Sequence, residues 1–148
     1  MPVREAARAD VPIVRGLQSL LPHPVTALFA DGLPPGITLV AVPDGARVEP
    51  GAAGDGTPVG YVHAYTTGYV AEVAVAPAHR GRGHGRALLW TCLGELRARG
   101  LDRAELEVAA DNDRARSLYE SLGFEVVARR ENRYESGDGL RMRARLDE

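Results

Sequence analysis

The sequence predicts one α/β domain with a mixed sheet, and three observations lead to that class. The length of 148 residues suits a single domain with a hydrophobic core. The composition is that of a globular protein, with 45% apolar and 26% charged residues. The hydrophobic periodicity gives the order strand, helix, helix, three strands, helix, strand, helix, two strands. Residues 1–148 are therefore expected to form one domain.

The elements of the first half follow from caps and periodicity. Val3–Glu5 is predicted to be a short strand, and Asp10 is a suitable N-cap for the helix that follows. That helix carries an apolar stripe made of Ile13, Val14, Leu17, Leu20 and Leu21. A short second helix is expected over 25–30 and a strand over 37–42. Residues 43–58 are rich in glycine, alanine and proline, which predicts a loop.

The second half alternates strands with two helices. Strands at 59–65 and 69–75, separated by Thr66-Thr67-Gly68, predict a hairpin. A helix then runs to about Arg99 and ends at Gly100. The last predicted elements are a strand at 104–108, a helix capped within Asp111-Asn112-Asp113 and ended by Gly123, and strands at 124–131 and 140–146.

A basic, glycine-rich turn connects the strand ending at Val75 to the helix that carries Leu88 and Leu89. It reads Arg80-Gly81-Arg82-Gly83-His84-Gly85-Arg86. Glycines permit positive φ and close approach of a ligand to the backbone. The unpaired N–H groups at a helix N-terminus attract anions, and the arginines add positive charge. The turn therefore predicts a site for a phosphate or pyrophosphate group.

Composition excludes several other functions. The chain has no lysine, so the turn is not a nucleotide-binding P-loop, and Schiff-base chemistry is excluded. The net charge of −2 argues against a nucleic-acid-binding domain built on the arginine turn. Cys92 lies in an apolar helical stripe and is expected to be a buried structural thiol. His23, His63 and His79 lack metal-ligand spacing, so no metal is expected.

Two sequence blocks resemble the GNAT superfamily of N-acetyltransferases. The first is Arg80-Gly81-Arg82-Gly83-His84-Gly85, which fits the family pattern Arg/Gln-x-x-Gly-x-Gly/Ala between a strand and a helix. The second comprises Leu106-Glu107-Val108, Asn112, Leu118-Tyr119 and Gly123-Phe124. The resemblance covers about residues 68–124, and its layout is loosely that of the ribosomal-protein N-terminal acetyltransferases. It implies a mostly antiparallel central sheet of about six to seven strands flanked by about four helices.

The resemblance also implies acetyl-CoA as co-substrate and assigns roles to residues. The pantetheine arm would pair with the strand around 71–75, and the pyrophosphate would sit on backbone N–H groups of 81–86. Tyr119 would protonate the departing thiolate, and Asn112 would bond to the pantetheine or to a bridging water. The expected cofactor-binding residues are Val73, Ala74, Val75, Arg80, Gly81, Arg82, Gly83, His84, Gly85, Arg86, Asn112 and Tyr119.

Three of these residues have a structural alternative. Tyr119 lies on an apolar stripe, which is typical of a core tyrosine, and Asn112 is also a helix cap. Glu72 is a carboxylate in an apolar strand and either faces solvent or acts in the cleft as a base. His84 is expected to contribute its backbone N–H rather than its imidazole.

No residue pattern suggests an acyl-enzyme, so direct attack of an amine on the thioester in a ternary complex is expected. A peptide α-amine has a pKa of about 8 and a lysine amine about 10.4, so the α-amine is deprotonated more cheaply and is the favoured acceptor. The alternatives are a small-molecule amine, a lysine side chain, or a non-catalytic acyl-CoA-binding regulatory module. A cytoplasmic monomer or homodimer without nucleic-acid or membrane partners is expected.

Overall fold

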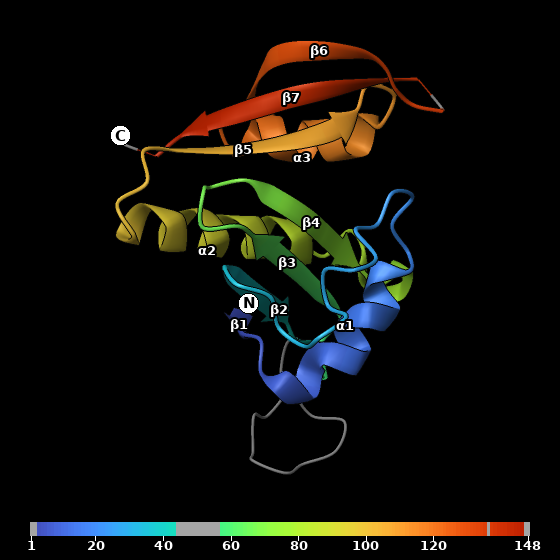
Figure 1. The fold of residues 1–148 in the computed structure, drawn as a ribbon, viewed down its shortest axis with the longest axis vertical. Helices are drawn as coiled ribbons and strands as arrows, with labels where there is room; N and C mark the ends of the chain where they lie inside the picture. Colours follow the sequence, from blue (N-terminus) through green and yellow to red (C-terminus); the bar gives the residue numbers. More distant parts are fainter. Residues whose placement is uncertain (1–2, 44–56, 136, 147–148) are drawn as a thin grey trace.

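Seven strands and three α-helices make up the described part of the chain in the computed structural model, which covers residues 3–43, 57–135 and 137–146. The glycine-rich stretch predicted as a loop over 43–58 therefore lies mostly outside the described residues. In Figure 1 the N-terminal strands with α1 and α2 form one half, and the C-terminal strands with α3 form the other.

The strands form two antiparallel sheets. The first has the order β1 (Val3–Glu5), β2 (Ile37–Ala41), β3 (Gly60–Ala64), β4 (Val70–Val75). The second has the order β5 (Arg103–Ala109), β7 (Gly137–Arg145), β6 (Glu125–Tyr134). A parallel bridge between Tyr69 and Glu105 joins them. The mostly antiparallel arrangement of seven strands is thus confirmed, but the sheet is divided between β4 and β5.

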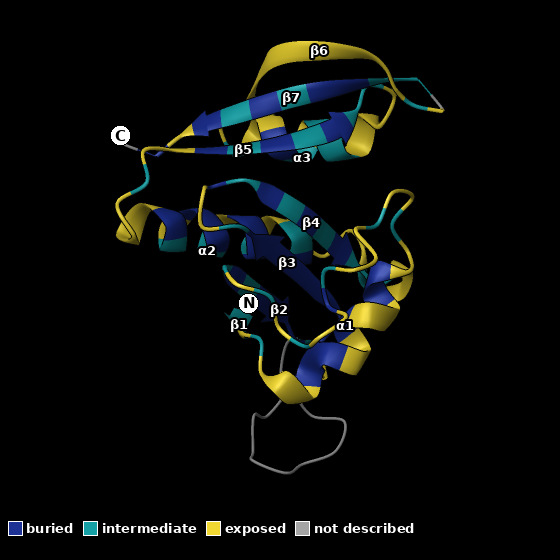
Figure 2. Cartoon of the chain, viewed as in Figure 1, coloured by how far each residue is buried: buried dark blue, intermediate teal, exposed yellow. Residues whose placement is uncertain are grey.

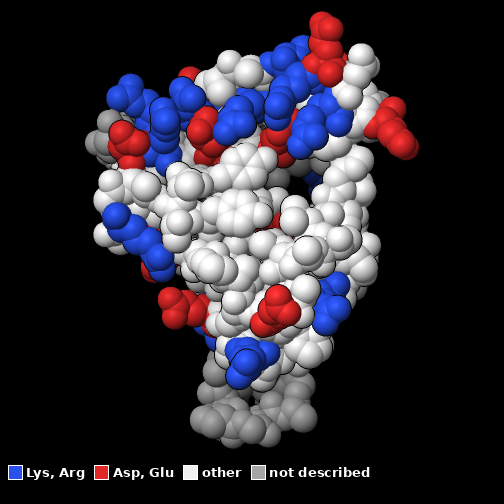
Figure 3. Space-filling view, viewed as in Figure 1, with Lys and Arg blue, Asp and Glu red and all other residues white. Residues whose placement is uncertain are grey.

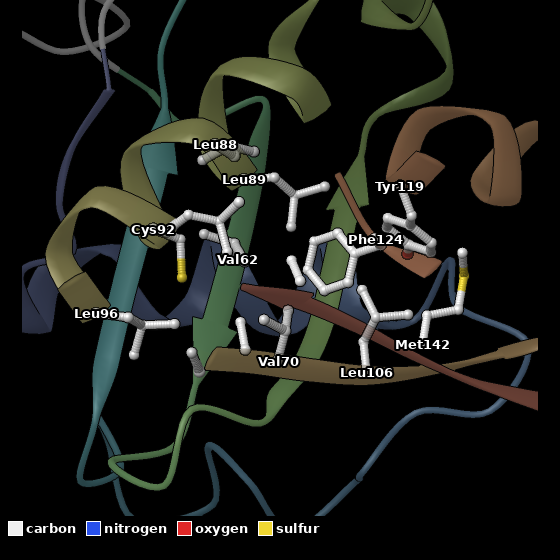
Figure 4. Packing of buried hydrophobic residues seen from close by; sticks show 14 of the residues in the cluster. Val62, Val70, Leu88, Leu89, Cys92, Leu96, Leu106, Tyr119, Phe124 and Met142 are labelled. Carbon is white, nitrogen blue, oxygen red and sulfur yellow. The ribbon is translucent and has the colours of Figure 1, made fainter. Parts of the chain in front are cut away.

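Two hydrophobic clusters hold the helices on opposite faces of the first sheet. α2 (His84–Ala98) packs Leu89, Cys92 and Leu96 into the cluster that contains Val62, and this cluster continues to Leu106, Phe124 and Met142 (Figure 4). α1 (Val11–Gln18) packs Val14 with Phe29 and Tyr61 on the other face. Because both faces are covered, every residue of β3 is buried (Figure 2).

The N-terminal helix differs from its prediction in two ways. Val14 and Leu17 of the predicted stripe are buried, whereas Ile13 and Leu20 are 40% and 42% exposed. Asp10 occupies the N-cap position, but its carboxylate accepts bonds from Arg4 at 2.7 and 3.0 Å and from the Ala7 N–H at 2.7 Å instead of capping the helix. The Arg4 guanidinium lowers the pKa of the Asp10 carboxyl.

The short helix predicted over 25–30 is wrong, because this segment forms successive turns. Six residues make too few internal hydrogen bonds to offset the cost of nucleating a helix, and Phe29 reaches the core from a turn. The other elements lie within a few residues of their predicted bounds. α3 (Asp113–Ser121) and α2 end next to Gly123 and Gly100, both with positive φ. β7 begins at Gly137, three residues before the predicted strand.

Cys92 is buried and free, as predicted, and burial raises the pKa of its thiol to about 12. Among the described residues, no helix is both long and apolar enough to cross a bilayer. The described part also contains no group of three or more histidine, cysteine or acidic side chains placed to hold a metal ion.

Candidate active site

A cleft of about 1080 Å³ lies where the two sheets separate. β4 and β5 meet at the Tyr69–Glu105 bridge and diverge beyond it (Figure 1). Residues 70–75 of β4 and 106–109 of β5 line opposite walls. The glycine-rich turn, the start of α3 and the segments 20–25 and 133–135 complete the lining. The divergence of the strands therefore creates the space that a ligand can enter.

The wall formed by β4 turns backbone N–H and C=O groups toward the cleft. Ala76 donates its N–H to the Val59 carbonyl across the β3 side, and backbone direction alternates along an antiparallel strand. The N–H and C=O groups of Val73 and Val75 therefore point away from β3 and toward the cleft. Ala74, which was also predicted to bind cofactor, lines the cleft but turns its backbone groups toward β3. Such an open strand edge can pair with an extended amide-bearing ligand.

The glycine-rich turn delivers the N-terminus of α2 to the same cleft. Gly81 and Gly83 have φ of +76° and +87°, a conformation that an L-residue adopts only with strain. Gly83 is the N-cap of α2 and makes no side-chain cap bond, and the N–H groups at the start of a helix attract anions. Gly85 is helical, and a Cβ there would lie 3.4 Å from Leu118. Every residue of the turn from Arg80 to Arg86 except Arg82 lines the cleft.

The three arginines of the turn have different positions. Arg80 donates from Nε to the Val75 carbonyl at 3.0 Å, and Arg86 donates to the Ser121 hydroxyl at the end of α3. Arg82 is exposed and does not line the cleft, so the structure does not support its predicted place among the cofactor-binding residues. Arg114 on the first turn of α3 does line the cleft, and the sequence patterns did not indicate it.

His84 is buried beside the turn, with only 3% of its surface exposed. Its ring lies 6.1 Å from that of His79, and both residues line the cleft. A buried ring is consistent with the prediction that His84 offers its backbone N–H to an anion.

Tyr119 and Asn112 come to the cleft from α3. Tyr119 is 8% exposed, and its ring packs edge-on against Phe124 while the residue also lines the cleft. Burial raises the pKa of its phenol to about 12, so the group keeps its proton at neutral pH. The Asn112 side chain accepts a bond from the Ala115 N–H at 3.2 Å, which caps α3. The two side chains therefore have the structural roles considered above, core packing for the tyrosine and helix capping for the asparagine. Both residues also line the cleft.

Glu72 is buried in the cleft wall rather than exposed to solvent. Its carboxylate accepts from the Tyr61 hydroxyl at 2.9 Å, from the Val25 N–H at 2.7 Å and from the Gln18 amide at 3.0 Å. The same Gln18 amide donates to the Val25 carbonyl at 2.7 Å. Glu72 therefore ties the end of α1 and the segment after it to β4, and its lone pairs are largely occupied by these bonds.

Glu107 on β5 is a second carboxylate in the cleft, and no sequence pattern singled it out. Its side chain is 5% exposed and pairs with Arg133 at 3.1 Å and Arg130 at 3.4 Å. The alternation of β5 places it opposite in direction to the buried Leu106 and Val108. The alternation along β5 is visible in the sequence, but the sequence does not show that this face of the strand borders a cleft.

Aromatic side chains from both halves meet at one part of the cleft, here called the aromatic mouth (His23, Tyr65, Tyr69 and Tyr134). The rings of His23 and Tyr134 stack at 4.3 Å, and those of Tyr65 and Tyr69 at 6.2 Å. Burial raises the pKa of the Tyr69 phenol, and the charge of Glu107 adds to the effect. Glu107 therefore lies close to the mouth.

Comparisons with known proteins agree with this geometry. The mycothiol acetyltransferase of Beutenbergia cavernae is 53% identical over 62 residues, 42% of this chain and 21% of that protein. The [ribosomal protein bS18]-alanine N-acetyltransferase of Escherichia coli is 46% identical over 68 residues, 46% of each chain. The chain thus aligns with less than half the length of these two curated relatives.

Solved structures match over nearly the whole fold. The crystal structure of the ribosomal-protein-S18-alanine N-acetyltransferase from E. coli has a TM-score of 0.79 at 22% identity, covering 99% of this chain and 94% of that one. A phosphinothricin acetyltransferase from Sinorhizobium meliloti in complex with acetyl-CoA has a TM-score of 0.73 at 20% identity, covering 98% and 88%. The family model described as "Acetyltransferase (GNAT) family" matches residues 23–124. The chain therefore belongs to the GNAT acetyltransferase family.

Proposed function

We propose that the protein transfers an acetyl group from acetyl-CoA to a primary amine by direct attack in a ternary complex. One observation carries the proposal: the cleft-facing edge of β4 runs to the N-terminus of α2, and Tyr119 lines the same cleft. The strand edge suits the extended, amide-bearing arm of acetyl-CoA, and the helix N-terminus suits its pyrophosphate. The tyrosine suits the thiolate that leaves. Bound acetyl-CoA supplies the activated acetyl group, and the chain's own residues supply orientation and proton transfer.

The backbone of the cleft would hold the cofactor. The N–H and C=O groups of Val73 and the N–H of Val75 pair with the pantetheine amides, as an added strand would, while the Val75 carbonyl accepts from Arg80. The N–H groups of residues 84–86 bind the pyrophosphate, where the helix dipole favours negative charge. Arg86 and Arg114 line the cleft and add positive charge on the same side. The Asn112 amide combines its capping bond with a contact to the pantetheine.

Tyr119 donates a hydrogen bond and then its proton to the thiolate that leaves. Its raised pKa keeps the phenol protonated until the transition state demands the proton. Glu107 takes the proton of the attacking amine through water, because it is a carboxylate at the aromatic mouth. From the sequence, Glu72 was expected either to face solvent or to act in the cleft as a base. Its three donors suit it better to hold residues 18–25 against β4, so that the acceptor meets a fixed wall.

The favoured acceptor is the α-amine of a peptide or protein N-terminus. At neutral pH a lysine amine costs about 3 kcal/mol more to deprotonate than an α-amine, and a site whose proposed base is one carboxylate, Glu107, suits the amine that needs less free energy. The E. coli relative, whose name is [ribosomal protein bS18]-alanine N-acetyltransferase, supports the same acceptor class. A small-molecule amine is the second candidate, because the mycothiol acetyltransferase relative shares 53% identity over its matched stretch. The activity belongs in the cytoplasm, where acetyl-CoA is made available.

An acetyl-transfer screen tests these proposals. Thiol release from acetyl-CoA is measured with N-terminal peptides, lysine peptides with blocked N-termini, polyamines and aminoglycosides. The expected result is the highest kcat/KM with an N-terminal peptide. Preference for an aminoglycoside would establish the second candidate. Binding of acetyl-CoA without transfer to any amine would instead identify a regulatory acyl-CoA-binding module.

A further inference from the structure

We propose that the acceptor polypeptide carries acidic side chains a few residues after its N-terminus, and that arginines beside the aromatic mouth select them. This inference rests on the proposed function, because it names the substrate class of the same site. The arginines in question are Arg130, Arg133, Arg141 and Arg143 of β6 and β7, here called the arginine face.

The arginine face is one continuous surface. Glu105 and Glu107 of β5 lie opposite Arg143 and Arg141 in the β5–β7 register. These residues alternate with buried ones, so they share the face of the sheet that the buried core does not occupy. Figure 3 shows positive side chains gathered over the sheet of β5, β6 and β7, with acidic side chains between them.

Positive charge is in excess on this face. Glu105 is shared by Arg141 at 3.3 Å and Arg143 at 3.1 Å. Glu107 is likewise shared by Arg133 and Arg130. Each cluster of two guanidinium groups and one carboxylate therefore has a net charge of +1. Two such clusters lie side by side, in a chain whose overall net charge is −2.

The guanidinium groups have donors to spare. The side chains of Arg130, Arg133, Arg141 and Arg143 are between 36% and 52% exposed, whereas the side chains of Glu105 and Glu107 are 18% and 5% exposed. Each guanidinium has five N–H donors, and the contacts within the described residues use one or two of them. A guanidinium group can bind a carboxylate through a fork of two parallel hydrogen bonds, so donors remain for a substrate carboxylate.

The face adjoins the mouth through two cation–π contacts. The Arg141 guanidinium lies 5.6 Å from the Tyr69 ring, and that of Arg133 lies 5.7 Å from the Tyr134 ring. Both tyrosines line the cleft. An extended peptide advances about 3.3 Å per residue, so the third to sixth residues of an acceptor held at the mouth would reach these guanidinium groups.

An acidic peptide fits this surface better than a nucleic acid. Nucleic-acid binding is driven by many phosphate contacts and is typical of proteins with a strong positive charge, whereas this chain is net negative. The excess positive charge lies beside the site where an amine is acetylated, and Glu105 shows that two neighbouring guanidinium groups of this face can share one carboxylate.

The test compares three peptides that share their first two residues and carry Glu, Gln or Lys at positions three to six. The Glu peptide should have a KM about 10-fold lower than the Gln peptide at low ionic strength, with similar kcat. The Lys peptide should have the highest KM. The difference should shrink to about 2-fold at 0.5 M salt, because exposed charges are screened.

Two variants should shift the preference in opposite directions. The double variant, Arg141→Gln with Arg143→Gln, should abolish most of the preference for the Glu peptide. It should leave kcat for the Gln peptide unchanged. Glu105→Gln should lower the KM of the Glu peptide further, about 3-fold, because it frees both arginines. The control, Arg8→Gln with Arg99→Gln, removes two exposed charges elsewhere and should retain the preference.

Three outcomes would overturn the inference. Equal KM values for the three peptides would refute acidic selection and leave the proposed N-terminal acetyltransferase intact. A shift of the same sign in Glu105→Gln and in the double arginine variant would assign these residues a structural role only. Salt-sensitive retention of RNA that the double arginine variant loses would assign the face to nucleic acid. Absence of transfer to every peptide would instead refute the proposed function itself.

Discussion

Tyr119 belongs to the hydrophobic core and to the cleft at once. Its ring packs with Phe124 and lies near Leu106 and Met142 (Figure 4). The packing orients the ring, and burial holds the phenol in its neutral form with a pKa of about 12. A core tyrosine and a proton donor are therefore compatible descriptions of this residue. Removing the hydroxyl separates the two roles, because phenylalanine retains the packing but has no proton to donate.

Replacing Tyr119 by phenylalanine should lower kcat about 100-fold and change cofactor affinity little. The free energy of unfolding should stay within about 1 kcal/mol of the parent, because the ring contacts remain. Since the pKa of the phenol is raised to about 12, the shape of the alkaline limb should be the same in both proteins. Steady-state kinetics and thermal denaturation measure both effects. An unchanged kcat would return Tyr119 to a purely structural role.

Glu72 and Glu107, two of the carboxylates that line the cleft, should respond differently to the same change. Glu107→Gln should reduce kcat/KM most at low pH, about 10- to 100-fold, because the amine then lacks its proton acceptor. Glu72→Gln should chiefly destabilise the protein, by about 1–3 kcal/mol, since three donors lose a charged acceptor. It should also raise the KM of the acceptor. Parallel pH profiles for Glu107→Gln and the parent would exclude Glu107 as the base. A loss of kcat/KM at low pH that occurs only in Glu72→Gln would identify Glu72 as the base.

At the scale of elements, caps and glycine stops were predictable because they are local. Asn112 caps α3, and the helices end beside Gly100 and Gly123, as the sequence indicated. The segment over 25–30 was predicted wrongly because local apolar residues do not reveal that Phe29 inserts into a core built by α1 and β3. Tertiary packing, which depends on residues distant in sequence, decided that segment.

The cap of α3 offers a way to separate two roles of one side chain. Asn112→Ala should destabilise the protein by about 1 kcal/mol, and Asn112→Ser should restore most of that loss, because serine is also a good N-cap. Both variants should bind acetyl-CoA more weakly if the amide contacts the pantetheine. Thermal denaturation reports the cap, and cofactor titration reports the contact. Full affinity in Asn112→Ser would leave Asn112 with the capping role alone.

At the scale of the whole molecule, the cleft results from the division of the sheet. The sequence indicated seven strands and a glycine-rich turn suited to a phosphate group, but no local pattern records that β4 and β5 diverge. For that reason Glu107 and Arg114 could not be assigned to the cleft from the sequence. The glycine turn was recognised because its backbone conformation is encoded within a few residues.

Binding of acetyl-CoA should stabilise the whole fold, because the cofactor would bridge β4, α2 and α3. At a concentration about 100 times the Kd, the gain is about 2.7 kcal/mol, seen as a higher Tm. Gly81 and Gly100 provide a matched pair, with φ of +76° and +87° and no atom within 4 Å of the position that a Cβ would occupy. Alanine at either position should cost about 1 kcal/mol of backbone strain in the free protein.

Only Gly81→Ala should reduce the rise in Tm that acetyl-CoA causes, because Gly81 shapes the turn that presents the first N–H groups of α2 to the cleft. Gly100→Ala should retain the full rise, since Gly100 follows the distant end of the same helix. Differential scanning fluorimetry of the parent and the two variants, each with and without millimolar acetyl-CoA, measures the three rises in Tm. Equal rises in the two variants would show that the turn does not bind the pyrophosphate, and no rise in the parent protein would refute cofactor binding by the cleft.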